Sequence, residues 1–147
     1  MEDNWNPQRR IRQKLARWNI DGPDNTIATN VLQNLLQIGK LCPPRIHAAC
    51  LGTACNKWVT HRRFQQRRKA SNVCRFGCQT DHSNPEDSLE HYFQCRVIKS
   101  CLSRYAHINT EDGQKHALLS YGRRNDTENI TLGTLGYCIY KMYNHYR

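Results

Sequence analysis

Apolar residues recur every three or four positions along most of the chain, which is the spacing of one face of an α-helix. In residues 8–19 this spacing places Ile11, Leu15 and Trp18 on one stripe among basic side chains, and Asp-Gly-Pro at 21–23 then breaks the helix. We find no convincing run of alternating apolar and polar positions. The chain is therefore predicted to be mainly α-helical.

Two further helices are predicted in the first half of the chain. Asn25 or Thr26 can cap the first of them, and Gly39 is expected to end it. Its core stripe is formed by Ile27, Val31, Leu35 and Ile38, with Leu32 and Leu36 beside them. The next helix is predicted to start at Pro44, because a proline at the first helical position loses no hydrogen bond. Its apolar face consists of Ile46, Ala49, Cys50, Thr53 and Ala54, and the pattern allows it to run through Trp58 into a basic stretch.

Three helices are predicted in the second half. The first begins at Asn84–Pro85, with Glu86 and Asp87 in its first turn and an inward stripe of Leu89, Phe93, Val97, Cys101 and Tyr105. A short helix at 112–122 is closed by Gly122. Asp126 or Thr127 caps the last helix, in which Ile130, Leu135, Ile139 and Met142 face inward. Its four tyrosines, at 137, 140, 143 and 146, fit either packing on the same domain or docking on a partner.

Length and composition limit the size of the core. The 147 residues suit one domain, but 38% hydrophobic residues and a mean hydropathy of -0.82 predict a thin core. We expect a basic N-terminal extension or helix at 1–24 and a single helical zinc-binding domain at 25–147.

No apolar run approaches the roughly 18–20 residues that a transmembrane helix needs. The early acids and the lack of an apolar run at the start exclude a secretory signal, and a trimmed mitochondrial presequence stays open.

The positive charge is concentrated in one segment. Residues 25–80 carry nine Lys and Arg side chains and no Asp or Glu, which accounts for almost all of the formal net charge of +10. Ordinary protein surfaces mix the two signs. A segment without acids favours a polyanionic partner, and nucleic acid is the leading candidate over an acidic protein or a membrane surface.

The eight cysteines do not resemble a secreted disulfide framework. Such scaffolds are usually shorter and follow a signal peptide. Several of these cysteines, including Cys50 and Cys101, lie in helical apolar patterns, as buried free thiols do. We therefore expect an intracellular, reducing compartment, with the mitochondrion favoured over the nucleus.

Four of the residues that could bind a metal ion have a regular spacing. Cys74 and Cys78 can present two thiolates from a tight turn, in which Gly77 lets the backbone bend so that its amides face the sulfurs. His91 and Cys95 are four residues apart, so on one helix their side chains would point the same way. Together they predict a closed, structural Zn²⁺ site, since no position is left for a reacting water.

Two alternatives to this ligand set remain. His82, which lies in the loop four residues after Cys78, could take the place of the histidine ligand. The cysteines could also be buried separately as small apolar groups with no common site.

These residues resemble the zinc-binding region that follows the polymerase domain in reverse transcriptases of non-LTR retrotransposons. That region has a C-x(2-3)-C knuckle and then an acidic E-x-x-x-H-x-x-x-C helix. The matching residues here are Cys74, Cys78, His91 and Cys95, the lead-in Glu86–His91, and the upstream pieces Pro43–His47 and Trp58–Phe64. The resemblance covers about residues 43–95 and implies a zinc-stapled unit that binds nucleic acid. The chain lacks the Tyr-x-Asp-Asp polymerase motif and the clustered carboxylates of a two-metal nuclease, so the catalytic chemistry of that family is not implied.

The basic segment 57–75 is the predicted nucleic-acid contact. Its candidate residues are Lys57, Arg62, Arg63, Phe64, Arg67, Arg68, Lys69 and Arg75. Arginine pairs with phosphates and stacks on bases, so a mixture of arginine and phenylalanine suits RNA. Like charges four residues apart on a helix repel each other unless phosphates neutralise them. A solvated basic helix face and a nuclear localisation signal are the alternatives.

The combined prediction is a non-catalytic, zinc-binding and RNA-binding protein. We expect it to be a structural component of a large ribonucleoprotein, most readily a mitochondrial ribosomal protein that contacts rRNA and neighbouring proteins. No membrane and no small-molecule substrate is expected. The alternatives are a retroelement-derived nuclear DNA-binding module and a fragment of a reverse transcriptase.

Overall fold

The described part of the chain is built from helices alone. The computed structural model describes residues 6–20, 26–60, 73–78 and 85–146, and within these ranges no β-strand occurs. The helices are α1 (Pro7–Ala16), α2 (Thr26–Leu41), α3 (Pro44–Ala54), α4 (Leu89–Tyr92), α5 (Arg96–Ala106), α6 (Glu111–Leu119) and α7 (Asp126–His145). The prediction of a mainly α protein is confirmed.

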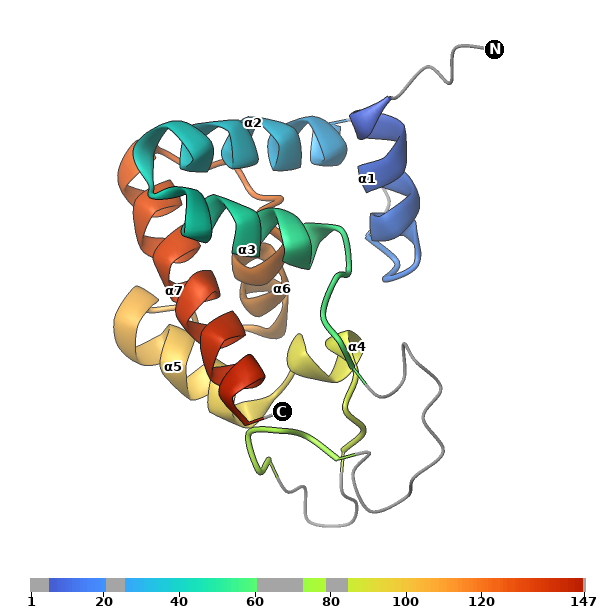
Figure 1. Ribbon diagram of the computed structural model, residues 1–147, viewed down its shortest axis with the longest axis vertical. Helices are drawn as coiled ribbons and strands as arrows, with labels where there is room; N and C mark the ends of the chain where they lie inside the picture. Colours follow the sequence, from blue (N-terminus) through green and yellow to red (C-terminus); the bar gives the residue numbers. More distant parts are fainter. Residues whose placement is uncertain (1–5, 21–25, 61–72, 79–84, 147) are drawn as a thin grey trace.

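The core lies where α2, α3 and α7 meet. α7 packs against both α2 and α3, α1 covers α2, and α6 lies behind α3 (Figure 1). Val31 and Ile38 of α2 are fully buried at this junction. Gly133 of α7 has its α-carbon close to Ile38, so that a β-carbon there would lie 3.5 Å from the Ile38 side chain. The small residue thus lets the two helices approach closely.

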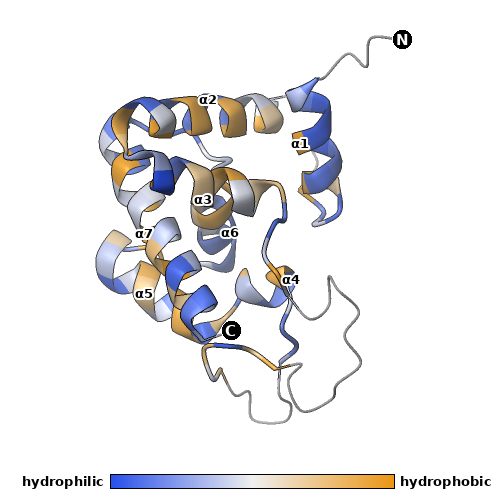
Figure 2. Ribbon diagram, viewed as in Figure 1, coloured by the Kyte–Doolittle hydropathy of each residue, from blue (hydrophilic) through white to orange (hydrophobic). Residues whose placement is uncertain are grey.

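α1 buries a narrow apolar stripe. Ile11, Leu15 and Trp18 are buried as predicted, and Trp18 meets Phe93 edge to face at 5.2 Å. The rest of the helix is hydrophilic along most of its length (Figure 2). Asn6 caps it by accepting a hydrogen bond from the Arg9 backbone N–H. The apolar stripe alone therefore positions a strongly basic helix on the domain.

α2 does not end at Gly39, as predicted, but continues to Leu41. The ring of His47 lies 3.4 Å from where a β-carbon of Gly39 would be, so the glycine accommodates a neighbouring helix and does not terminate its own. The helix stops at Cys42 because the following proline, Pro43, disfavours helical backbone in the residue before it. Leu36, predicted near the core stripe, is 64% exposed.

α3 begins at Pro44 and buries all five residues of its predicted apolar face. It ends at Ala54, so the extension of this helix through Trp58 is wrong. Asn56 adopts a positive φ of 53°, which ends the helical path. Trp58 is nevertheless fully buried, since the chain turns it back into the core.

The single helix predicted from residue 84 is instead two helices. α4 begins after Ser88, whose hydroxyl accepts a hydrogen bond from the His91 backbone N–H, and ends at Tyr92. α5 starts only at Arg96. This break changes the inward stripe of α5, which buries Ile98 and Leu102 while Val97 and Tyr105 are exposed (38% and 60%). The predicted stripe assumed one continuous helical register, which the break removes.

Two helix boundaries in the C-terminal part also differ from the prediction. Ser120, with a φ of 60°, follows α6 in place of the predicted Gly122. Asn125, one residue before the predicted caps, forms a capping box with Glu128 at the start of α7. α7 turns Asn129, Gly133, Ile139 and Tyr143 inward, whereas the predicted Ile130 and Met142 are each 43% exposed.

The capping box of α7 gives a first testable prediction. Asn125→Ala removes the acceptor of the Glu128 backbone N–H, at 2.9 Å, and should lower the free energy of unfolding by about 1 kcal/mol. Thr131→Ala, an exposed position in the same helix, is the control and should change it by less than about 0.5 kcal/mol. Urea denaturation followed by circular dichroism measures both, and equal effects would show that the cap contributes nothing.

The tyrosines of α7 divide between core and surface. Tyr143 is fully buried, and its hydroxyl donates a hydrogen bond to the Val59 carbonyl at 2.7 Å. Tyr137 and Tyr140 are partly buried, and Tyr146 is 57% exposed. The packing role of this helix on its own domain is thereby established. Among the described residues, each helix is too short or too polar to cross a bilayer.

Candidate metal centre

The first part of the site is a turn that presents the Cys74 sulfur. The Gly77 backbone N–H donates to the Cys74 carbonyl at 3.1 Å, and Gly77 has a φ of +68°, which a glycine adopts without strain. The backbone N–H groups of Phe76 and Cys78 then hydrogen-bond the Cys74 sulfur. The predicted use of Gly77 to turn backbone amides toward a sulfur is confirmed.

The second part of the site is the junction between α4 and α5. His91 belongs to α4, and Cys95 is the residue that precedes α5. The two residues therefore do not share one helix face, as the spacing had predicted. They come together because the chain bends at Phe93–Cys95 between the two helices.

The structure brings Cys74, His91 and Cys95 together. One ligand atom from each, two sulfurs and a ring nitrogen, lies within 4.8 Å of the other two, so the group could hold a metal ion. The two sulfurs are 3.8 Å apart. Two thiolates that share a tetrahedral ion, at about 2.3 Å from each, would be separated by about 3.8 Å, whereas a disulfide requires about 2.05 Å. None of the eight cysteines forms a disulfide.

The His91 ring has one buried nitrogen, Nε2, without a hydrogen-bond partner in the described part of the chain. A buried polar atom of this kind costs free energy unless a ligand satisfies it. Separately, one His91 ring nitrogen lies within 4.8 Å of both sulfurs and could bind a metal ion held by them.

The pKa values of the two cysteines in the group are shifted in opposite directions. The hydrogen bond from the Cys95 thiol lowers the pKa of Cys74, and the His91 side chain and the two backbone amides act in the same direction. The same hydrogen bond, together with burial, raises the pKa of Cys95, although the Val97 and Ile98 N–H groups at the start of α5 oppose this. Metal binding needs deprotonated thiols, so binding at this pair is expected to release protons.

The remaining predicted ligands are placed as follows. Cys78 is buried, at 7% exposure, but its sulfur is not part of the three-residue group. It follows Cys74 in the same turn. His82 lies outside the described residues, so its competition with His91 stays untested. The group that the structure assembles therefore offers three ligands, and the fourth stays a prediction.

A buried carboxylate, that of Asp87, contacts residues that adjoin two of the candidate ligands. Asp87 is fully buried, accepts a hydrogen bond of 2.6 Å from the Tyr92 hydroxyl and lies 3.6 Å from the Nε of Arg75. The Tyr92 hydroxyl in turn accepts from the Arg75 backbone N–H at 3.2 Å. Because Arg75 and Tyr92 are direct neighbours of Cys74 and His91, this network ties the turn to α4.

α6 and α7 complete this support. The side chain of Gln114, in α6, is 1% exposed and donates to the carbonyls of Tyr92 and Cys95 at 2.9 and 3.3 Å. The Tyr143 hydroxyl of α7, which donates to the Val59 carbonyl, also lies 3.4 Å from Asp87. Sequence reasoning placed Asp87 in the lead-in Glu86–His91 but gave no supporting role to Asp87, Tyr92 or Gln114. Tyr92 and Asp87 lie close to His91 in the chain, whereas Gln114 is distant and left no signal.

The predicted nucleic-acid contacts fall mostly on residues that the structure does not describe. Arg62, Arg63, Phe64, Arg67, Arg68 and Lys69 lie outside the described ranges. Lys57 is exposed, whereas Arg75 is largely buried and pairs with Asp87. Before the gap Thr60 is buried, and after it Val73 is 37% exposed and Cys74 is buried. The described residues that flank the gap therefore include a core residue on one side and a residue of the candidate metal site on the other.

Comparison with family models, with curated proteins and with solved structures finds no match to this chain. The functional argument consequently rests on the residues themselves.

Proposed function

We propose that the metal centre is a structural Zn²⁺ site with Cys74, Cys78, His91 and Cys95 as its four ligands. The sulfur separation of 3.8 Å and a His91 ring nitrogen within 4.8 Å of both sulfurs support a tetrahedral ion. Cys78, which is buried four residues after Cys74, is the residue proposed to complete the set. Three thiolates and one imidazole saturate the ion, so its role is to join the turn, α4 and α5, not to activate a water.

We further propose that the protein binds RNA and is not an enzyme. The observation that carries this proposal is the acid-free segment 25–80 with its nine positive side chains. The densest part of that segment leaves the core at Thr60 and returns at Cys74 of the metal centre. A zinc ion bound at one end of the basic segment would hold that end in a defined position. The arginines of the segment could then contact RNA phosphates close to the zinc site.

The setting we propose is a large ribonucleoprotein, specifically a mitochondrial ribosome, in which the protein contacts rRNA and its protein neighbours. A thin core, one heavily basic segment and a metal staple suit a protein whose stability is completed by its RNA. The observation that would favour a retroelement-derived nuclear DNA-binding module, or a reverse-transcriptase fragment, is the zinc-region resemblance at residues 43–95. Sedimentation of the endogenous protein distinguishes these settings: a large particle that collapses on ribonuclease treatment supports the first, and slow, ribonuclease-insensitive migration contradicts it.

Charge reversal in the basic segment tests RNA binding directly. A variant with Arg62, Arg63, Arg67 and Arg68 changed to Glu should lose RNA binding and keep its metal. If five or six phosphates are contacted, log K of the unchanged protein should fall against log salt with a slope of about -3.5 to -5. Fluorescence anisotropy with a labelled RNA measures both quantities.

The matched control reverses four exposed cations elsewhere, Arg96, Lys99, Arg104 and Lys141, and so changes the net charge equally. Its RNA affinity should fall by much less than that of the segment variant. Equal losses in the two variants would mean that only net charge matters and would remove the basic segment from the interface.

A further inference from the structure

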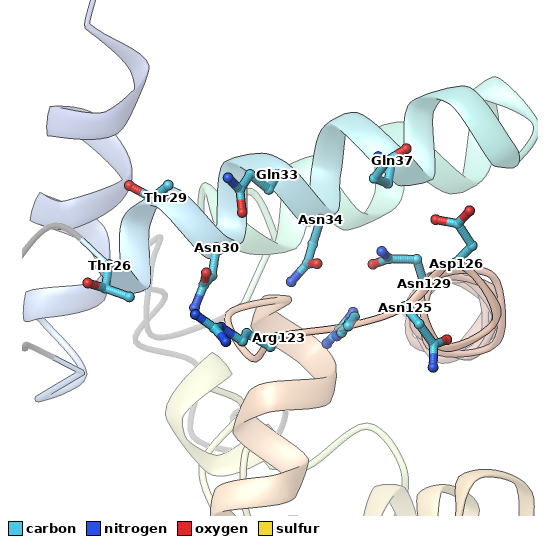
Figure 3. Close-up of a pocket in the computed structure, with 11 residues that line it drawn as sticks. Thr26, Thr29, Asn30, Gln33, Asn34, Gln37, Arg123, Asn125, Asp126 and Asn129 are labelled. Atoms are coloured by element: carbon cyan, nitrogen blue, oxygen red, sulfur yellow. The ribbon is translucent and has the colours of Figure 1, made fainter.

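A polar cleft of about 980 Å³ lies between α2 and the start of α7. Figure 3 shows side chains from α2 on one wall and from the α6–α7 turn and α7 on the other. It is distant from the metal centre, which α4 and α5 form at the opposite end of the fold (Figure 1). Neither the Cys74, His91 and Cys95 group nor Lys57 and Arg75, the described candidates of the basic segment, line it.

The lining of the cleft is uncharged and polar along α2. Thr26, Asn30, Gln33 and Gln37 follow one another at three- or four-residue spacing and so form a single stripe of hydroxyl and amide groups. Among the described residues, only Thr, Asn, Gln, Arg and Asp side chains line the cleft. A ligand that needs an apolar face, such as a stacked nucleobase, is therefore not suited to it.

Asn129 gives the cleft a specific requirement. Its side chain projects from α7 across the cleft toward α2 (Figure 3). It is only 1% exposed, and its Oδ1 atom has no hydrogen-bond partner in the described part of the chain. The nearby Asn34 amide cannot satisfy it, because both of its N–H groups donate to the carbonyls of Ser120 and Gly122 at 2.7 and 2.6 Å. A buried hydrogen-bond acceptor without a donor costs free energy, so a ligand that donates a hydrogen bond to this atom would be favoured.

The charged groups of the cleft are two arginines and one acid. Arg124 is already used inside the protein, where it donates to the carbonyls of His116 and Ala117 at the end of α6. Arg123 is exposed and reaches toward Asn30 across the cleft (Figure 3). Asp126 lies on the α7 side, beyond Asn129 from Arg123. Arg123 is thus the cation placed to meet an anionic ligand group.

We propose that this cleft binds the ribose–phosphate backbone of RNA, with a ribose 2′-hydroxyl donating to Asn129 Oδ1 and a phosphate accepting from Arg123. The backbone of nucleic acid offers acceptors at every phosphate, and the 2′-hydroxyl is the donor that RNA adds and DNA lacks. The amide stripe of α2 suits the remaining sugar and phosphate oxygens. This inference rests on the proposed function and adds to it the choice of RNA over DNA.

The test compares single-stranded RNA, DNA and 2′-O-methyl RNA of one sequence by fluorescence anisotropy at a fixed salt concentration. The unchanged protein should bind RNA about tenfold more tightly than either analogue, the loss expected for one hydrogen bond to a buried acceptor. Asn129→Leu should remove that preference and leave DNA binding unchanged. Arg123→Ala should weaken binding to all three, because it removes a phosphate contact. Asn144→Leu, an amide near the other end of α7, is the matched control and should change nothing.

The outcomes separate this inference from the function on which it rests. If the unchanged protein binds none of the three, the RNA-binding function fails and the cleft assignment fails with it. If it binds RNA and 2′-O-methyl RNA equally, the function stands and the cleft assignment is overturned. The comparison of RNA with 2′-O-methyl RNA uses only the unchanged protein, so it remains decisive even if Asn129→Leu lowers stability. A preference that persists in folded Asn129→Leu would also overturn the role of Asn129.

Discussion

The double substitution His91→Ala and Cys95→Ala should release the bound metal and lower the free energy of unfolding by several kcal/mol. The free energy of binding a structural zinc ion is also folding free energy, because the unfolded chain offers no preformed site. Here the effect should be large, since the ion would join the Cys74 turn, α4 and α5 at one point. A strong chelator should destabilise the unchanged protein in the same way.

Metal content by elemental mass spectrometry and thermal denaturation by circular dichroism are the two measurements. Cys55→Ala is the matched control, because Cys55 is a partly buried free thiol outside the metal-binding group. It should keep one metal ion per chain. A double variant with unchanged metal content would refute the site. A variant that loses metal with no loss of stability would refute only its structural role. Cys78→Ala, measured alongside, tests the fourth ligand.

Trp58→Ala should be the most destabilising single substitution in the core, costing about 3–5 kcal/mol. Trp58 is fully buried, its ring centre lies 4.8 Å from that of Tyr143 and 5.4 Å from that of Tyr92, and its indole N–H donates to the Thr53 hydroxyl at 2.9 Å. Removal would leave a cavity among three aromatic rings and an unsatisfied hydroxyl acceptor. In a domain whose total stability is near the lower end of the usual range, about 5 kcal/mol, this loss would unfold a measurable fraction at 37 °C.

Urea denaturation followed by tyrosine fluorescence and far-ultraviolet circular dichroism measures the effect. Trp58→Phe should recover part of the stability, because it fills most of the cavity but lacks the indole donor. Tyr146→Ala, at an exposed aromatic position of α7, should change the free energy of unfolding by less than about 0.5 kcal/mol. If Trp58→Ala were no worse than Tyr146→Ala, the aromatic cluster would not be the link between the α3–α4 segment and α7.

The helices that sequence reasoning predicted best are those whose signals are local. The start of α3 at Pro44 and its five-residue apolar face needed only neighbouring residues, because a proline at the first turn and a periodic stripe act within the helix itself. The break between α4 and α5 gave no such signal. Phe93 and Cys95 continue the apolar pattern across the break, so the sequence looks like one helix. Their burial comes instead from contacts with distant parts of the chain.

The candidate site shows the same division. The Cys74 turn was predictable, because a glycine at positive φ and two backbone amides act over four residues. The partners Asp87, Gln114 and Tyr143 were not, since Gln114 meets the Cys95 carbonyl from α6 and Tyr143 reaches Asp87 from 56 residues away. A hydrogen bond between residues so far apart leaves no periodic trace in the sequence.

By itself, the sequence determined the helical class, the concentration of positive charge and the residue types that suit a metal ion, since periodicity, charge and ligand chemistry are properties of the residues. Only the tertiary structure decided which ligands meet, through the bend between α4 and α5, and which polar groups are left unsatisfied. His91 Nε2 and Asn129 Oδ1 became informative only when packing removed them from water without a partner. Burial depends on the whole fold. A buried amide or imidazole atom without a hydrogen-bond partner costs free energy, and a bound ligand can remove that cost.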